Sequence, residues 1–183
     1  ARELGSRVVL KILSGEITHK SDVGGVVLNL RSEGELAAAY ASLSARLGPR
    51  VTVQRQASRG IELAFGCVMD PDFGPLVMVS PGGTLVELFD ERQFARAPFG
   101  PRQAEGMIRR LAVSRLIDGV RGEAPRNMKA AAQALSDFSL ACASLASQVR
   151  EIDVNPVVVT EAGATAVDAL IVPRVAANEE VDA

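Results

Sequence analysis

The sequence contains no tryptophan, one tyrosine, one histidine and two cysteines in 183 residues. A single histidine and two widely separated cysteines argue against a zinc site, which needs clustered nitrogen and sulfur ligands. A disulfide framework is also unsuited to a chain of this length. Cys67 and Cys142 are therefore predicted to be buried, reduced thiols.

Several functional signatures are missing as well. The chain has neither the G-x-S-x-G elbow of a serine hydrolase nor the glycine-rich loop of a P-loop protein. No apolar run is long enough for a membrane-spanning helix, and no signal peptide is recognisable. The 20 basic and 22 acidic residues are dispersed, without a basic stripe. We therefore expect a cytoplasmic protein with neither nucleic acid nor a membrane as a partner.

The sequence does contain enough apolar material for a folded core, since 48% of its residues are hydrophobic. Short β-branched and aliphatic runs predict strands at residues 8–13, 25–30, 51–56, 61–69, 75–80 and 84–89, and a hairpin from 152–160 and 165–172. Apolar residues at helical spacing predict helices at 32–47, 101–118 and 128–149. The first helix begins with a capping-box pair, Ser32 and Glu35. Helices that alternate irregularly with hairpins favour an α+β fold.

The two ends of the chain add an expectation about its extent. The first ten residues read as the last turn of a helix, a stop at Gly5 and the start of a strand, without an initiating methionine. We therefore expect an N-terminal part to precede this chain. Residues 174–183 are small, acidic and aperiodic, which predicts a flexible tail after a domain that spans residues 1–173.

Oxygen-bearing side chains gather in the predicted C-terminal hairpin. Asp153 and Asn155 are two residues apart on one strand and so share a face, and the return strand brings Asp168 opposite them. Such oxygens suit Mg²⁺, which keeps several waters and takes further oxygens from phosphate. The alternative is a polar strand edge with a turn at Asn155 and Pro156. The carboxylate inside the run TAVDALIV favours the metal, because an unpaired buried charge is costly.

Two further features each allow two interpretations. Lys11, in the apolar strand VVLKIL, is either an edge residue whose charged end reaches solvent or a fixed cation directed at a phosphate. Gly82 and Gly83 either form a turn between strands or let the backbone approach a ligand closely.

His19, the only histidine, precedes Lys20, Ser21 and Asp22 in a loop between two predicted strands. A single loop histidine is commonly a solvated side chain. Here, however, Lys20 and Ser21 can donate to phosphate oxygens and Asp22 can orient the imidazole, whose neutral nitrogen is a competent phosphoryl acceptor. This group of residues therefore favours phosphate chemistry at His19.

Four segments, HKSDVGG, DPDFGP, LIDGVRGEAP and EIDVNP, occur in this order along the chain. Together they resemble the ATP-grasp domain of NDP-forming acyl-CoA synthetases, relatives of ADP-forming acetate–CoA ligase and of the succinyl-CoA synthetase β subunit. The resemblance implies an ATP-grasp fold of mixed and antiparallel sheets with flanking helices, lacking part of its N-terminal lobe. It also implies interconversion of acyl-CoA, ADP and phosphate with acid, CoA and ATP through a phosphohistidine.

The resemblance implies a nucleotide site for ATP or ADP. Lys11 matches the strand lysine that contacts the ATP phosphates, and Glu62 matches a carboxylate near the nucleotide. The other implied nucleotide-binding positions are a hinge segment beside the adenine and a glycine pair: Gln54, Arg55, Gln56, Gly82 and Gly83.

The resemblance also assigns the metal, the phosphoryl carrier and the partners. Asn155 and Asp168 match the Mg²⁺ ligands, and His19 matches a phosphoryl-carrying histidine. The principal phosphohistidine of the family lies on the CoA-binding half, so CoA-binding and CoA-ligase domains are expected on the same polypeptide or on a partner subunit. The rival interpretations are a module that senses ATP or ADP without turnover and a docking element without nucleotide affinity, and a homo-oligomer remains open.

Overall fold

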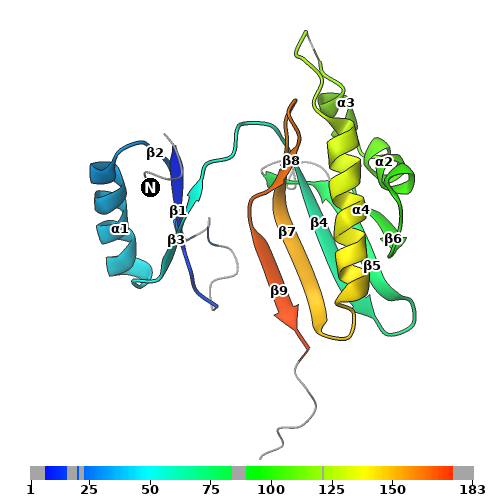
Figure 1. Ribbon diagram of the computed structural model, residues 1–183, viewed down its shortest axis with the longest axis horizontal. Helices are drawn as coiled ribbons and strands as arrows, with labels where there is room; N and C mark the ends of the chain where they lie inside the picture. The colour runs from blue at the N-terminus through cyan, green and yellow to red at the C-terminus, as the bar shows by residue number, and fades with distance from the viewer. Residues whose placement is uncertain (1–6, 16–19, 21–22, 84–89, 121, 175–183) are drawn as a thin grey trace, which may run out of the picture. The chain divides into compact units, whose positions relative to one another are not determined.

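The computed structural model describes residues 7–15, 20, 23–83, 90–120 and 122–174. These form two compact units, one within residues 1–57 and the other within residues 58–183 (Figure 1). Each unit is an antiparallel sheet with helices packed against it. The predicted α+β class with antiparallel sheets and flanking helices is therefore confirmed.

Unit 1 is a small sheet with one helix. Its elements are β1 (Val8–Ile12), β2 (Val26–Leu30), α1 (Glu33–Leu47) and β3 (Val51–Arg55). The central strand is β1, which is antiparallel to both β2 and β3. Helix α1 packs on one face of this sheet, against a core that includes Leu10, Ile12 and Leu43.

The start of α1 follows the predicted capping pattern. The Ser32 hydroxyl accepts a hydrogen bond from the backbone N–H of Glu35 at 3.1 Å. The Glu35 carboxylate accepts in turn from the backbone N–H of Arg31 at 2.7 Å. Two backbone donors at the helix start are thereby satisfied, which explains why the helix begins here.

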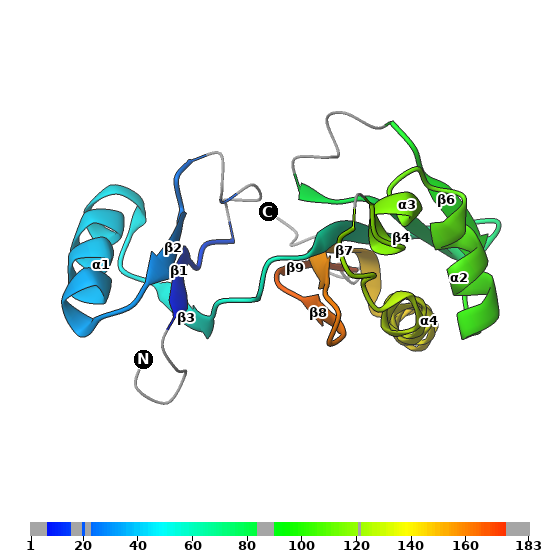
Figure 2. The same ribbon diagram turned by 90° about the horizontal axis from the view of Figure 1, so that it is seen from above.

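Unit 2 is a larger sheet covered by helices. Its elements are β4 (Ile61–Asp70), β5 (Gly74–Pro81), β6 (Gln93–Arg96), α2 (Pro101–Arg109), α3 (Ser114–Ile117), α4 (Met128–Ser144), β7 (Val149–Val159), β8 (Ala164–Ala166) and β9 (Ala169–Pro173). The strand order is β6-β5-β4-β7-β8, and β9 also pairs with β7. Helices α2 and α4 lie on the same face of this sheet (Figure 2).

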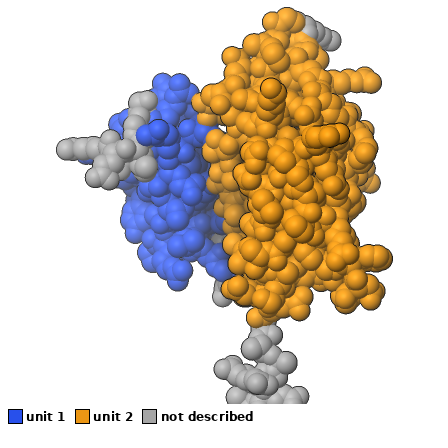
Figure 3. Space-filling model, turned by 45° about the vertical axis from the view of Figure 1, so that its right-hand side comes forward, with its two compact units in different colours: residues 1–57 blue, residues 58–183 orange. Residues whose placement is uncertain are grey.

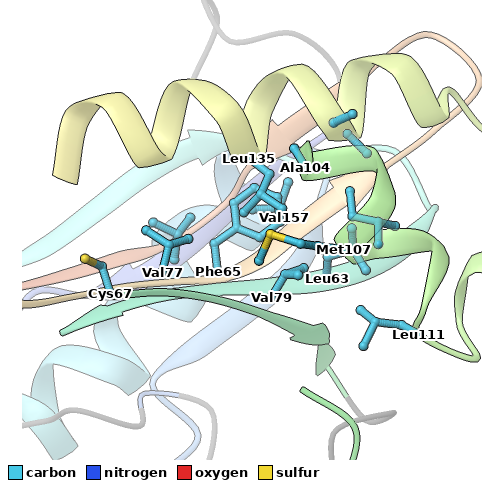
Figure 4. Packing of buried hydrophobic residues seen from close by; sticks show 14 of the residues in the cluster. Leu63, Phe65, Cys67, Val77, Val79, Ala104, Met107, Leu111, Leu135 and Val157 are labelled. Atoms are coloured by element: carbon cyan, nitrogen blue, oxygen red, sulfur yellow. The ribbon is translucent and has the colours of Figure 1, made fainter. Parts of the chain in front are cut away.

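The core of unit 2 lies between the sheet and these helices (Figure 4). Its best-buried members include Leu63, Phe65, Val77, Val79, Met107, Leu111, Leu135 and Val157. Successive side chains of a strand point to opposite faces. The intervening β4 residues Glu62, Ala64 and Gly66 therefore point to the face turned away from α2 and α4, which we call the far face.

The single helix predicted at residues 101–118 is wrong, because the chain leaves the helix after Arg109 and forms the separate short helix α3. Two side chains satisfy the backbone groups at this break. The Glu91 carboxylate accepts from the N–H of Ala112 at 2.6 Å, and the Ser114 hydroxyl donates to the carbonyl of Arg109 at 3.3 Å. Glu91 lies outside the segment from which the helix was predicted, so its effect could not be seen in the local periodicity.

The long helix predicted at 128–149 also ends earlier than expected, at Ser144. Residues from Val149 onward belong to β7, where Val149 pairs with Pro173 and the N–H of Arg174 donates to the carbonyl of Gln148 at 2.8 Å. The pairing of β7 with β9 thus takes up residues that were predicted as helix, although the local sequence contains no glycine or proline that would end the helix.

The C-terminal hairpin pairs as predicted, but its return strand is divided. Both β8 and β9 pair with β7, and the interruption between them falls at Val167 and Asp168. The strand predicted at 84–89 lies outside the described residues. Strand β6 was not predicted, because it is a short edge strand whose Phe94 side chain is 63% exposed, without the apolar run that marks an inner strand.

Two remaining expectations concern cysteine and the membrane. Cys67 and Cys142 are both buried, as predicted. Within the part of the chain that the structure describes, no helix is long and apolar enough to cross a membrane. Most of the residues predicted as a flexible tail, from 175 onward, lie outside that part.

A buried serine on α4 provides a test of this packing. The Ser139 hydroxyl accepts from the backbone N–H of Phe99 at 3.1 Å and donates to the carbonyl of Ser136 at 2.7 Å. Ser139→Ala removes that acceptor from a buried donor, and we expect the free energy of unfolding to fall by ~1–3 kcal/mol in urea titrations. The matched control is Ser144→Ala, an exposed serine of the same helix, with an expected change within ~0.5 kcal/mol. Equal losses in the free energy of unfolding for Ser139→Ala and Ser144→Ala would show that the hydrogen bond to Phe99 does not stabilise the fold.

Candidate functional site

The residues of the predicted site divide between the two units (Figure 3). Unit 1 contains Lys11, Gln54, Arg55 and Gln56. Unit 2 contains Glu62, Gly82, Gly83, Asn155 and Asp168. His19, Ser21 and Asp22 lie outside the described residues.

Lys11 is held on the central strand of unit 1. Its side chain is only 5% exposed, and β1 is flanked by strands on both sides. Leu10 and Ile12 face α1, so strand alternation directs Lys11 to the opposite face of the sheet. The edge-strand interpretation of this lysine is thereby excluded, and Lys11 is a charge fixed by a rigid strand.

The hinge residues do not all share this face. Gln54 lies opposite Val9 on the neighbouring strand, and Val9 shares the orientation of Lys11, so Gln54 and Lys11 belong to the same face. Arg55 lies opposite Val8, which faces α1, and so belongs to the other face. Unit 1 thus brings Lys11 and Gln54 onto one surface and separates Arg55 from them.

The Gln56 side chain is held by an asparagine that the sequence analysis did not single out. The backbone N–H of Asn29 donates to Gln56 Oε1 at 2.7 Å, and Gln56 Nε2 donates to Asn29 Oδ1 at 3.1 Å. Asn29 has a φ of 62°, a conformation that asparagine tolerates better than most residues. An asparagine inside the apolar run VVLNL was the signal that could have identified it. The amide pair fixes Gln56 where the chain leaves β3.

In unit 2, the glycine pair lies directly against Glu62. The N–H of Gly82 donates to the Glu62 carbonyl at 2.8 Å, and a Cβ on Gly82 would lie 2.7 Å from the carbonyl oxygen of Leu63. Gly83 has a φ of 57°, and a Cβ there would overlap the Glu62 carboxylate. The fold therefore brings together three of the predicted site residues. Close approach of the two backbones requires glycine at position 82, and the positive φ favours glycine at position 83.

Asn155 and Asp168 face one another across the β7 ladder. The N–H of Asn155 donates to the carbonyl of Asp168 at 3.2 Å, and the adjacent pair is Val154 with Ala169. Directly opposite residues of antiparallel strands have Cβ atoms roughly 5 Å apart on one face. The predicted opposition of these two residues is therefore what the strand register produces.

Asn155 also lies in a β-bulge. Leu63 pairs with Val157 and Phe65 with Val154, so the chain of β7 contains one residue more than the chain of β4 between these pairs. A bulge redirects the side chains of the strand that carries it. The simple alternation that placed Asp153 beside Asn155 is interrupted within this part of β7.

The oxygen-bearing side chains of this hairpin can be compared with the ligands that a metal ion requires. Among the described residues, no three acidic, histidine or cysteine side chains form a cluster able to hold one. Asn155 and Asp168 supply two oxygen-bearing side chains, one exposed and one half-buried. Such a pair fits Mg²⁺, which is commonly bound by one or two protein oxygens together with waters and phosphate oxygens.

The family model described as "ATP-grasp domain" matches residues 1–172, and the chain therefore belongs to the ATP-grasp family.

The curated relatives are acyl-CoA ligases. The chain is 37% identical over 179 residues to acetate–CoA ligase [ADP-forming] I of Archaeoglobus fulgidus, covering 92% of this chain and 25% of the relative. It is 35% identical over 181 residues to the β subunit of acetate–CoA ligase [ADP-forming] I of Pyrococcus furiosus, covering 93% of this chain and 76% of that subunit. The chain thus spans about a quarter of the single-chain relative and about three quarters of the separate β subunit.

Solved structures of a related enzyme agree with the fold. The dinucleotide-forming acetyl-coenzyme A synthetase 1 of Ca. Korarchaeum cryptofilum, in complex with coenzyme A, Ca-AMPCP and HgCl⁺, has a TM-score of 0.84 and 38% identity, over 94% of this chain and 79% of that chain. A second structure of that enzyme contains coenzyme A and Mg-AMPPCP and has its phosphohistidine segment pointing towards the nucleotide-binding site. Its TM-score is 0.81 at 40% identity, over 94% of this chain and 79% of that chain. The predicted relationship to NDP-forming acyl-CoA synthetases is confirmed.

The contact of the glycine pair with β4 can be tested by substitution. Gly82→Ala forces a Cβ against the backbone of Leu63, which cannot move without displacing β4, and we expect the free energy of unfolding to fall by ~1–3 kcal/mol. Gly106→Ala is the matched control, because this α2 glycine has no atom within 4 Å of an added Cβ. Alanine favours helix, so this control is expected to be neutral or slightly stabilising. Thermal and urea unfolding measure both, and a neutral Gly82→Ala would contradict the close approach.

Proposed function

We propose that this chain is the nucleotide-binding portion of an NDP-forming acyl-CoA synthetase, an acid–thiol ligase that interconverts acyl-CoA, ADP and phosphate with acid, CoA and ATP. Membership of the ATP-grasp family and the ADP-forming ligases among its relatives support this assignment. Phosphoryl transfer depends mainly on positioning and on stabilising charge. Those are tasks that a fixed cation and rigid oxygen donors perform.

We propose that residues of unit 1 contact the nucleotide. Lys11 would place a point charge near the phosphates, and its strand would keep that charge in position when nucleotide leaves. Gln54 and Gln56 would lie beside the adenine, with Gln56 held by its amide pair to Asn29. Arg55, on the other face of the sheet, is the weakest member of this group, because the register separates it from Lys11.

We also propose nucleotide contacts for residues on the far face of unit 2. Glu62 is on this face, and the backbone of Gly82 and Gly83 adjoins it. The Gly82 N–H is already bonded to the Glu62 carbonyl, so the glycine pair would serve by letting the backbone approach the ligand closely.

We propose Asn155 and Asp168 as the protein ligands of Mg²⁺. The observation that carries this proposal is their direct opposition across the β7 ladder, which presents an amide and a carboxylate oxygen on one face. Mg²⁺ would neutralise phosphate charge when bound. The relatives with Mg-AMPPCP and Ca-AMPCP are consistent with a divalent ion at an equivalent site.

We further propose His19 as a phosphoryl carrier that receives phosphate from the nucleotide and exchanges it with the CoA-binding half of the enzyme. A covalent carrier divides one difficult transfer into two easier ones. The CoA-binding and CoA-ligase domains would be the partners, on the same polypeptide or on another subunit. Because acyl-CoA, ADP and phosphate are cytoplasmic metabolites, we propose that the protein is located in the cytoplasm.

Calorimetric titration with Mg-ATP and Mg-ADP tests the nucleotide and metal assignments. We expect binding that requires Mg²⁺ and that Asp168→Asn weakens at least tenfold, a loss of ~1.4 kcal/mol or more. Asp137→Asn is the matched control, since it removes an exposed carboxylate on α4, and should bind as the unsubstituted protein does. Binding without a Mg²⁺ requirement would refute the metal assignment. Absence of binding at millimolar nucleotide would favour the docking element.

The role of Lys11 has its own test. Lys11→Met keeps the length and apolar stem of the side chain but removes its charge, and we expect the affinity for Mg-ATP to fall at least tenfold while adenosine binding changes little. Lys129→Met is the control, because Lys129 is exposed on α4. Equal loss for ATP and adenosine would indicate a general disturbance of the sheet.

Phosphorylation of His19 can be tested without mapping, because the chain contains no other histidine. With labelled ATP, Mg²⁺ and the CoA-binding half, we expect an acid-labile, base-stable label on this chain that His19→Asn abolishes. Nucleotide binding that persists while no such label forms would favour the sensing module over the catalytic one.

A further inference from the structure

The two cysteines of the chain are brought together by the packing of α4 on β4. These elements run in the same direction, because α4 is joined by a short turn to β7 and β7 is antiparallel to β4 (Figure 1). Phe65 of β4 contacts Phe138 of α4, with ring centroids 5.8 Å apart. Residues two apart along a strand are separated by about 6.6 Å, and residues four apart along a helix by about 6 Å. Cys67 is two residues after Phe65 and Cys142 is four residues after Phe138, so the two cysteines lie nearly the same distance beyond the aromatic contact, in the same direction.

The surroundings of the two thiols agree with this geometry. Cys67 is 2% exposed and Cys142 is 0% exposed, and both belong to the core cluster of unit 2. Figure 4 shows Cys67 in this core. The neighbouring Cys142 thiol lowers the pKa of Cys67, whose own thiol donates to the Val68 carbonyl at 3.9 Å. The neighbouring Cys67 sulfur and burial together raise the pKa of Cys142. One of the two sulfurs is thus the easier to ionise, and the other remains protonated beside it.

The end of α4 is where a small reagent would enter. Cys142 lies in the last turn of α4, two residues before the helix ends at Ser144, and a series of turns follows before β7. Helix ends open locally far more often than whole domains unfold. A small uncharged oxidant can reach the sulfurs through such an opening, whereas a large or charged one is excluded.

We propose that Cys67 and Cys142 form an oxidative modification site, at which hydrogen peroxide converts the thiol pair into an intrachain disulfide that joins β4 to α4. One sulfur attacks a peroxide oxygen, the O–O bond breaks, and a sulfenic acid and one water result. The second sulfur then attacks the sulfenic sulfur, the S–S bond forms, the S–O bond breaks and a second water leaves. The thiols together lose two electrons and two protons, and the peroxide is reduced to two waters.

The bond would act on the stability of unit 2. It would close a loop between residues 67 and 142 and so restrict the unfolded chain. Both sulfurs lie on the helix-covered face of the sheet, opposite the far face that carries Glu62. The disulfide is therefore expected to raise the melting temperature without removing nucleotide binding, so the inference is independent of the proposed function.

The test treats the folded protein with hydrogen peroxide, removes the oxidant, and counts thiols after denaturation. We expect both thiols to disappear, a digested peptide pair linked through Cys67 and Cys142, a higher melting temperature, and full reversal by dithiothreitol. The linked peptides are the decisive product, because the four methionines also take up oxygen from peroxide. Retention of both thiols, uptake of oxygen at the cysteines without a link, or a link solely between two chains would each overturn the proposal.

Single-cysteine variants provide the control. In Cys142→Ala and Cys67→Ala, peroxide should produce neither an intrachain link nor a rise in melting temperature. A similar rise in either variant would show that another oxidised group is responsible. If a variant fails to fold, the comparison of oxidised and reduced unsubstituted protein still decides the question, because both forms have the same sequence.

Discussion

The ladder of β7 is the constraint on which unit 2 depends. This strand pairs with β4 on one side and with β8 and β9 on the other, so it links the first strand of the unit to the last. The extra residue of its bulge is Asn155 or its neighbour Pro156, and the interruption of its partner falls at Asp168. A further register shift of β7 lies between Val149 and Glu151. The proposed metal ligands thus lie at two of the irregular positions of this ladder, as expected where a bulge redirects side chains.

A similar logic applies to the approach of β5 to β4. The chain after β5 passes so close to β4 that the backbone of Leu63 excludes a side chain at Gly82, and a positive φ favours glycine at Gly83. The same closeness brings the Glu62 carboxylate next to Gly83. The packing of the strands and the proposed nucleotide contact therefore both favour glycine at these positions. In unit 1, the packing of the sheet likewise serves the proposed contact, because the central position of β1 fixes the charge of Lys11.

The candidate residues of each unit suit a different part of a phosphate–metal complex. Unit 1 contains a cation and amide groups, whereas unit 2 contains oxygen donors and glycine backbone. Phosphate oxygens require positive charge, and a metal ion requires oxygen ligands. The helix-covered face of unit 2 carries no candidate site residue, and the cysteine pair on that face concerns stability.

The sequence by itself determined the class of fold, most of the strands, the start of α1 and the order of the family motifs, because these follow from local periodicity, capping and spacing. It also determined that Asn155 and Asp168 face one another, since a short hairpin leaves little choice of register. Tertiary structure alone decided where α2 and α4 end, because Glu91 and the β7–β9 pairing compete with helix at residues distant in the sequence. It alone decided that Lys11 is central, that Asn29 holds Gln56 and that Cys67 meets Cys142. Each of these depends on which segments become neighbours, and periodicity within one segment contains no information about its neighbours.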